Sequence, residues 1–176
     1  MPASRSRWLV FGCLTPLLTG FDLWSKKAAV DALGSQPSLP IHSSWLSFVH
    51  AENPGAAFSS PVPIPVIVVA AAIGVGMLVH WLWKLEGKGR LAAVAAALVA
   101  GGAFGNLIDR IGDGTVTDFI RVSAADSALA PWLVQTFGTP TWPIFNLADI
   151  WLVVGIVMVM VLQREPSASA TPQPTP

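Results

Sequence analysis

Residues 101–110 read GGAFGNLIDR and residues 145–154 read FNLADIWLVV, two polar stretches that each adjoin an apolar run. The first leads on to Asp118, and the second contains Asp149. Carboxylates at the end of a lipid-facing helix are expensive to bury, so they usually mark a functional site. Two of them on separate segments predict a pair that converges in space. Paired carboxylates can share a proton and activate water, which is the chemistry of an aspartic peptidase.

The composition indicates a membrane protein. Of the 176 residues, 53% are hydrophobic and 11% are charged, whereas charged residues make up about a quarter of a soluble domain. The formal net charge of zero provides no basic surface for nucleic acid, and the lone Cys13 excludes an internal disulfide. The histidines at 42, 50 and 80 have no carboxylate or cysteine at ligand spacing, so we expect neither a metal ion nor a cofactor.

Four apolar segments predict an all-α membrane protein with four transmembrane helices. They cover residues 8–21 (continuing as a helix to 32), 62–85, 91–108 and 145–162. The second and fourth reach the roughly 20 residues that a bilayer crossing needs. The first and third reach that length only if their polar ends lie at the interface. One domain, residues 1–165, accounts for all four segments, and residues 166–176 form a Pro- and Ser-rich tail that we expect to be disordered.

Positive charge predicts the orientation of these segments. Arg5 and Arg7 precede the first segment, Arg164 follows the fourth, and the short link 84–90 carries three more basic residues. By the positive-inside rule, both termini, the tail and this link face the cytoplasm. The two long connections then face outward, and the candidate functional residues gather at that outer end.

Spacing along the predicted helices suggests which polar residues act together. Asn106 and Arg110 are four apart and share one helix face, while Asn146 and Asp149 are three apart and share another. Each motif also has a structural alternative. Asp109 and Arg110 would form an interfacial ion pair, and Asn146 with Asp149 would form a helix N-terminal cap. Their occurrence on the same side of the membrane favours a site.

Two further patterns predict packing within the bundle. Gly101 and Gly105 have the Gly-x-x-x-Gly spacing that permits close approach of helices. Asp22 and Lys26 are four apart in the favourable order of acid before base, and we expect a buried ion pair at the outer end of the first segment.

Other classes of protein remain open at this point. A small proton-coupled membrane transporter would also keep acids and an arginine within a bundle, but it predicts ionisable groups near the bilayer midplane. A scaffold protein would be insensitive to isosteric Asp-to-Asn changes. In this chain the acids lie at the outer ends of the predicted segments, which favours the peptidase.

Five motifs in fixed order carry a resemblance to a known family. They are Asp22-x-x-x-Lys26, Asn53-x-Gly55-Ala56-Ala57-Phe58, Gly105-Asn106-x-x-Asp109-Arg110, Val116-x-Asp118-Phe119 and Phe145-Asn146-x-Ala148-Asp149. Over residues 8–162 the chain resembles lipoprotein signal peptidase (signal peptidase II), a bacterial membrane aspartic peptidase. Each motif alone is weak, but five in order with the predicted topology are specific.

The resemblance implies a reaction and a set of roles. Asp118 and Asp149 would be catalytic; Asn53, Gly55, Asn106, Arg110 and Asn146 would bind substrate; Asp22, Lys26, Gly105 and Asp109 would support the site. The substrate would be a prolipoprotein whose cysteine already carries diacylglycerol, cut on the amino side of that cysteine.

The resemblance also implies a fold and a place in the cell. Four transmembrane helices would carry a small β-cradle and a short helix on the outer surface. The protein would lie in the bacterial inner membrane, surrounded by lipid, as a monomer with its active site at the periplasmic face. The chain departs from the family's usual pattern at Pro54 and Thr117, and its segment 120–144 is longer than usual.

Overall fold

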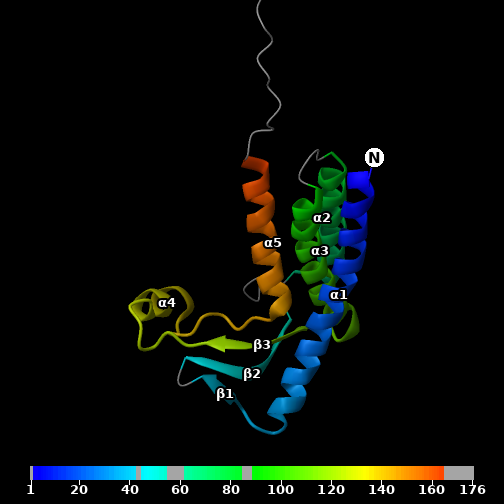
Figure 1. The fold of residues 1–176 in the computed structure, drawn as a ribbon. Helices are drawn as coiled ribbons and strands as arrows, with labels where there is room; N and C mark the ends of the chain where they lie inside the picture. The colour runs from blue at the N-terminus through cyan, green and yellow to red at the C-terminus, as the bar shows by residue number, and fades with distance from the viewer. Residues whose placement is uncertain (1, 43–44, 55–61, 85–88, 165–176) are drawn as a thin grey trace, which may run out of the picture.

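Four long helices follow the apolar runs of the sequence. The computed structural model describes residues 2–42, 45–54, 62–84 and 89–164. The long helices lie alongside one another (Figure 1) and are α1 (Pro2–Leu33), α2 (Ile64–Lys84), α3 (Gly89–Gly112) and α5 (Leu147–Arg164). Each of the four predicted segments is therefore helical over most of its described residues, and residue 85 of the second lies outside them. Gly55 and the tail 166–176 lie outside the described residues.

Helix α3 is the centre of the bundle because its small residues let neighbours approach closely. It packs against α1, α2 and α5. A Cβ atom placed on Gly101 would lie 2.8 Å from the Cβ of Leu18 in α1, and one on Gly102 would collide with the carbonyl oxygen of Ala148 in α5. The close packing predicted from the Gly101–Gly105 spacing is thus confirmed, since a Cβ on Gly105 would collide with Asp22 of α1.

The outer faces of the bundle are apolar. Among the described residues, α2 and α3 are long and apolar enough to cross a membrane, and the apolar part of α5, Leu147–Gln163, is shorter. Exposed aliphatic side chains cover α2 and α5, including Val69, Ile73, Val153 and Val157. A helix that exposes apolar side chains on most of its surface is stable in lipid and unfavourable in water.

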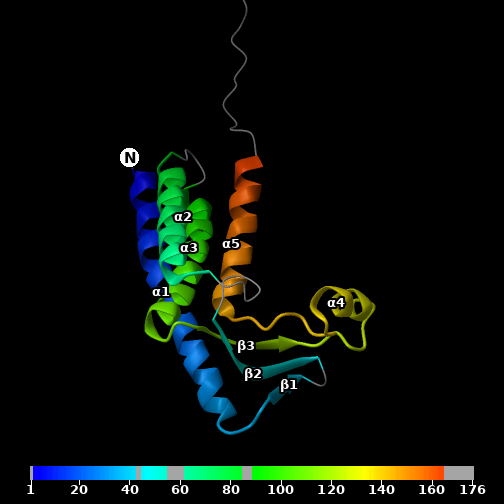
Figure 2. The same ribbon diagram turned by 180° about the vertical axis from the view of Figure 1, so that it is seen from behind.

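A small antiparallel sheet lies at one end of the bundle (Figures 1 and 2). It consists of β1 (Leu39–His42), β2 (Leu46–Asn53) and β3 (Val116–Val122), in the order β1-β2-β3. The expected sheet is present, so the chain is mostly helical rather than purely α. Strand β2 places Ala51 opposite Asp118 of β3, after an irregularity in register that follows Phe48.

The segment before α5 is tied to β3 by backbone hydrogen bonds. The N–H of Ile120 donates to the carbonyl of Phe145 at 2.8 Å, and the N–H of Phe145 donates back to Ile120 at 3.2 Å. This isolated bridge places the start of α5 beside the middle of β3. Two aspartates far apart in sequence are thereby brought to one place.

A short helix, α4 (Ala130–Phe137), occupies the longer connection between β3 and α5. Pro131 stands in its first turn, and Gly138 ends it with a φ of 75°, a conformation that favours glycine. Figures 1 and 2 show α4 to the side of the bundle, level with the first turns of α5. Helix α4 is a short helix outside the bundle, as the resemblance implies.

Candidate active site

Asp118 lies in the first half of β3, next to buried Phe119. Its side chain is buried, with 4% of the residue exposed. The Nδ2 of Asn53, at the end of β2, donates to one carboxylate oxygen at 3.2 Å, and the Nδ2 of Asn146 donates to the other at 2.7 Å. Both oxygens of a buried acid are therefore satisfied by uncharged amides.

Asp149 lies in the first turn of α5, and Asn146 caps that helix. The backbone N–H of Asp149 donates to the side-chain oxygen of Asn146 at 3.1 Å, and the N–H of Asn146 donates to the Asp149 carboxylate at 3.2 Å. This reciprocal arrangement is a capping box, which satisfies amides that the helix leaves without partners. The cap predicted as a structural alternative is thus present, and the same residues also face the other acid.

Two asparagines link the acids. The Oδ1 of Asn106 accepts from Asn146 Nδ2 at 3.1 Å and from Lys26 Nζ at 3.0 Å. With its oxygen occupied by these donors, the amide of Asn106 presents its Nδ2 to Asp149 at 2.9 Å. One network therefore runs from Asp118 through Asn146 and Asn106 to Asp149.

A buried lysine supports the network from behind. The Nζ of Lys26 lies 2.7 Å from Asp22 and 2.7 Å from Asp109, so the predicted Asp22–Lys26 ion pair is confirmed and has a second acid. Asp22 also accepts from the backbone N–H of Ala148 in α5 at 2.9 Å. The lysine and its carboxylates tie α1, α3 and α5 together next to the asparagines.

The carboxylate of Asp109 pairs with Lys26 of α1, whereas the sequence suggested an ion pair with its neighbour Arg110. The same carboxylate accepts weakly from the N–H of Thr117 at 3.4 Å. Arg110 is nearly buried and donates to the backbone carbonyl of Asn106 at 3.1 Å. Neighbouring residues on a helix point in directions about 100° apart, which explains why Asp109 faces α1 while Arg110 faces the cavity.

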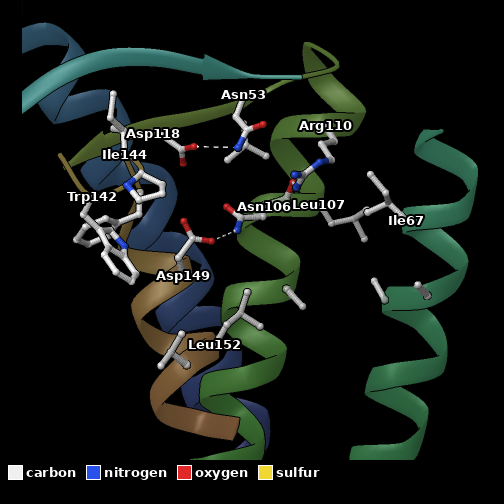
Figure 3. A pocket seen from close by; sticks show the side chains of 17 residues that line it. Asn53, Ile67, Asn106, Leu107, Arg110, Asp118, Trp142, Ile144, Asp149 and Leu152 are labelled. Carbon is white, nitrogen blue, oxygen red and sulfur yellow. Dashed lines mark hydrogen bonds between the residues drawn. The ribbon is translucent and has the colours of Figure 1, made fainter. Parts of the chain in front are cut away.

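The two aspartates face one cavity of about 520 Å³. Figure 3 shows Asp118 and Asp149 on its wall, with Asn53, Asn106 and Arg110 around them. The rest of the wall is apolar and comes from three helices, a strand and a loop: Ile67, Ala70 and Ala71 of α2; Ala103 and Leu107 of α3; Val116 of β3; Leu152 and Val153 of α5; and residues 142–145. A polar end and a long apolar flank suit a substrate with both a peptide bond and a lipid part.

Burial raises the affinity of Asp118 for its proton. Removal from water raises its pKa from the ordinary value of 3.8 to about 6; hydrogen bonds from Asn53 and Asn146 lower it, and the nearby charge of Asp149 raises it further. Asp149 accepts N–H donors from the side chain of Asn106 and from the backbone of Asn146. The two acids therefore lie in different environments, as a pair made of one proton donor and one carboxylate requires.

The structure divides the predicted site residues into two groups. Asn53, Asn106, Arg110, Asp118 and Asp149 line the cavity. Asn146, Asp22, Lys26, Gly105 and Asp109 lie behind the wall and hold the others. Gly55 lies outside the described residues.

Sequence reasoning missed the apolar wall of the cavity. Trp142, Pro143 and Ile144 border it from the loop before α5, and Ile67 borders it from α2. An apolar residue within an apolar segment carries no local signal of a binding role. The unusual length of segment 120–144 was the available hint for the loop.

A family model and curated relatives match this chain over most of its length. The model described as "Signal peptidase (SPase) II" matches residues 14–163. The lipoprotein signal peptidase of Xanthomonas oryzae pv. oryzae (strain PXO99A) is 34% identical over 158 residues, which cover 87% of each chain. That of Chlorobium phaeobacteroides (strain DSM 266 / SMG 266 / 2430) is 33% identical over 152 residues, covering 85% of this chain and 87% of the relative.

Solved structures of bacterial membrane enzymes share the fold. One, determined by the in meso method at 2.3 Å resolution, superposes with a TM-score of 0.73 at 22% identity and covers 94% of each chain. A second, at 1.9 Å, has a TM-score of 0.70 at 23% identity and covers 89% of this chain and 94% of that one.

Proposed function

The chain belongs to the signal peptidase II family of aspartic peptidases and removes signal peptides from prolipoproteins in a bacterial membrane, and we propose that Asp118 and Asp149 are its catalytic pair. The convergence of these two carboxylates on one cavity carries this proposal. Each acid accepts hydrogen bonds from asparagine amides, and one network of amides joins the two carboxylates.

The reaction follows from the different environments of the two acids. Ionised Asp149 takes a proton from a water molecule as the water attacks the scissile carbonyl carbon. Protonated Asp118, whose pKa is raised to about 6 by burial, donates a hydrogen bond to the carbonyl oxygen and stabilises the charge that develops there. A proton then passes to the leaving nitrogen as the carbon–nitrogen bond breaks. Asn53 and Asn106 keep the carboxylates oriented throughout.

The cavity walls support a lipidated substrate cut on the amino side of its cysteine. The scissile peptide would lie at the polar end, where Arg110 can donate to substrate carbonyl groups. The diacylglycerol on the cysteine would extend between Ile67 of α2 and Leu152 and Val153 of α5. Burial of acyl chains there is favourable by about 0.8 kcal/mol for each methylene group.

For the arrangement in the cell we propose four membrane spans with both termini in the cytoplasm. Basic residues near the chain ends and in the link 84–90 support this orientation. The sheet, and with it the cavity mouth, then face the periplasm. We also propose that the enzyme acts as a monomer, because one chain supplies both acids and the asparagines that hold them.

Cleavage of a defined substrate tests the catalytic pair. Purified protein is incubated with a diacylglyceryl-modified prolipoprotein, and the released signal peptide is quantified. Asp118→Asn and Asp149→Asn nearly preserve side-chain volume, so each variant should accumulate in the membrane yet lose cleavage. The double variant should be hardly worse than either single one, because the residues act as a unit. Asp113→Asn, in the turn after α3, is the matched control and should cleave normally.

A near-normal rate in either single variant would remove that aspartate from the mechanism. The family membership would stand in that case, and another group would have to act as the base in place of Asp149 or as the proton donor in place of Asp118.

A further inference from the structure

Helix α2 is packed unevenly along its length; we call its end at Lys84 the inner end and its end at Ile64 the outer end. At the inner end, Leu82 is fully buried in a core that includes alanines of α3. The guanidinium of Arg7 in α1 also donates to the carbonyl of Trp83 at 3.3 Å. Leu82 is the one buried residue of α2, whose residues 64–84 are all described. The inner end is therefore held by both neighbouring helices.

Towards its outer end, α2 stands away from the bundle. Gly74 shares one helix face with Ala71 and Leu78, and all three are half-buried. A Cβ atom on Gly74 would nevertheless meet no atom of the described residues within 4 Å. By contrast, a Cβ on Gly155 of α5 would lie 2.7 Å from the side chain of Val99 in α3. Helix α5 is thus in close contact with α3 along a stretch where α2 is not.

The loosely packed half of α2 is also a wall of the cavity. Ile67, Ala70 and Ala71 line the cavity from α2, and Leu152 and Val153 line it from α5. Figure 3 shows Ile67 across the cavity from Leu152. The position of the outer half of α2 therefore sets the width of the opening between α2 and α5.

Two glycines lie where the packed half of α2 ends. A Cβ on Gly76, like one on Gly74, would meet no described atom within 4 Å, so close helix packing requires neither glycine. Glycine weakens a helix interior, and glycine pairs are common sites of helix bending. Ile64 is ten residues from Gly74, about 15 Å along the axis, so a bend of about 20° would move it by about 5 Å.

We propose that the outer half of α2 is a gate that bends at Gly74 and Gly76 and admits the diacylglyceryl chains of the substrate from the bilayer. Val66 and Val69 on this half are exposed to the surroundings of the bundle, so bending costs few contacts with protein. Acyl chains that enter sideways between α2 and α5 stay in an apolar environment throughout. This inference rests on the proposed lipid-binding wall of the cavity and leaves the catalytic roles of the aspartates aside.

Distances between α2 and α5 test the gate. The full-length chain in a Cys13→Ala background is placed singly in nanodiscs of phosphatidylethanolamine and phosphatidylglycerol, and nitroxide pairs are measured by pulsed EPR. Val66→Cys with Val154→Cys forms the outer pair, and Val79→Cys with Val161→Cys forms the inner pair; all four positions are exposed. The distance distribution should be broader for the outer pair than for the inner pair.

Stiffening the hinge links this motion to cleavage. Gly74→Ala and Gly76→Ala place methyl groups in open space, so both variants should fold and melt at or above the wild-type temperature. They should narrow the outer-pair distribution and leave the inner pair unchanged. The kcat/KM on a lipidated precursor should fall roughly fivefold for one substitution and roughly twentyfold for both, if the bend is required before cleavage. Gly12→Ala in α1, where a Cβ would also meet open space, is the matched control and should change neither readout.

Three results would overturn the gate. An outer pair as narrow as the inner pair in the wild-type chain would show that the outer half does not move. Equal breadth in both pairs would show that α2 moves as a whole and does not bend at its glycines. Wild-type cleavage by variants with a narrowed outer pair would show that bending is not the step that admits substrate. The distances are measured without catalysis, so retained cleavage by Asp118→Asn would remove the catalytic pair and leave the gate standing.

Discussion

Replacing Asn146 tests whether the capping box and the catalytic pair share one residue. Its side chain is fully buried and donates to Asp118 at 2.7 Å and to Asn106 at 3.1 Å, while its oxygen accepts the N–H of Asp149 at 3.1 Å. Asn146→Ala removes these three bonds and a longer one, at 3.4 Å, to the carbonyl of Thr117. The loss of the cap should lower the free energy of unfolding by about 1 kcal/mol.

The effect on catalysis should be larger than the effect on stability. A buried acceptor left without its partner costs about 1–3 kcal/mol, which corresponds to a loss of roughly five- to a hundredfold in kcat/KM if the bond holds Asp118 in its reactive position. The hydrogen bond from Asn146 also lowers the pKa of Asp118, so its removal should raise that pKa further. The alkaline limb of the kcat/KM profile should therefore move to higher pH.

Asn146→Ser separates the two roles. Serine caps a helix as well as asparagine does, but it is too short to reach Asp118 and Asn106 together. We expect Asn146→Ser to melt close to the wild-type temperature in detergent and to cleave a lipidated precursor as slowly as Asn146→Ala does. If serine restores cleavage along with stability, the residue acts only through the helix cap and our account of the network is wrong.

Three further predictions concern pH, the ion cluster and topology. The kcat/KM of the wild-type enzyme should fall as pH rises through about 6, because Asp118 is active in its protonated form and its pKa is raised to about 6; a profile flat from pH 5 to 8 would contradict this. Lys26→Ala should lower the melting temperature and the cleavage rate together, because it leaves the carboxylates of Asp22 and Asp109 without their cation. Breaking a buried ion pair lowers the free energy of unfolding by about 3–5 kcal/mol. An unchanged melting temperature would show that the cluster is solvated. In a cysteine-free background, cysteines at Ser38 and Ala128 should react with an impermeant reagent outside intact spheroplasts, and a reactive cysteine at Gly87 would reverse the proposed orientation.

The hydrophobic pattern was sufficient to locate the helices. The segments expected at 62–85, 91–108 and 145–162 correspond to α2, α3 and α5 within a few residues. Helix α1 starts earlier than its apolar run and continues past Asp22 and Lys26, because those polar side chains are satisfied by α3 and α5 rather than by water. The sheet was expected from the family resemblance alone, since three short strands near a membrane have no distinct hydrophobic period.

Local sequence therefore determined where the helices lie, which residues could be acids of a site, and the cap at the start of α5, because these depend on neighbours within a few positions. The tertiary structure alone decided that Asn146 bridges Asp118 and Asn106, that Asp109 pairs with Lys26, and that α2 is buried only at its inner end. These contacts join residues up to 126 positions apart, as between Asp22 and Ala148. No local propensity encodes such pairs; they form because packing on the small residues of α3 brings the chain segments within hydrogen-bonding distance.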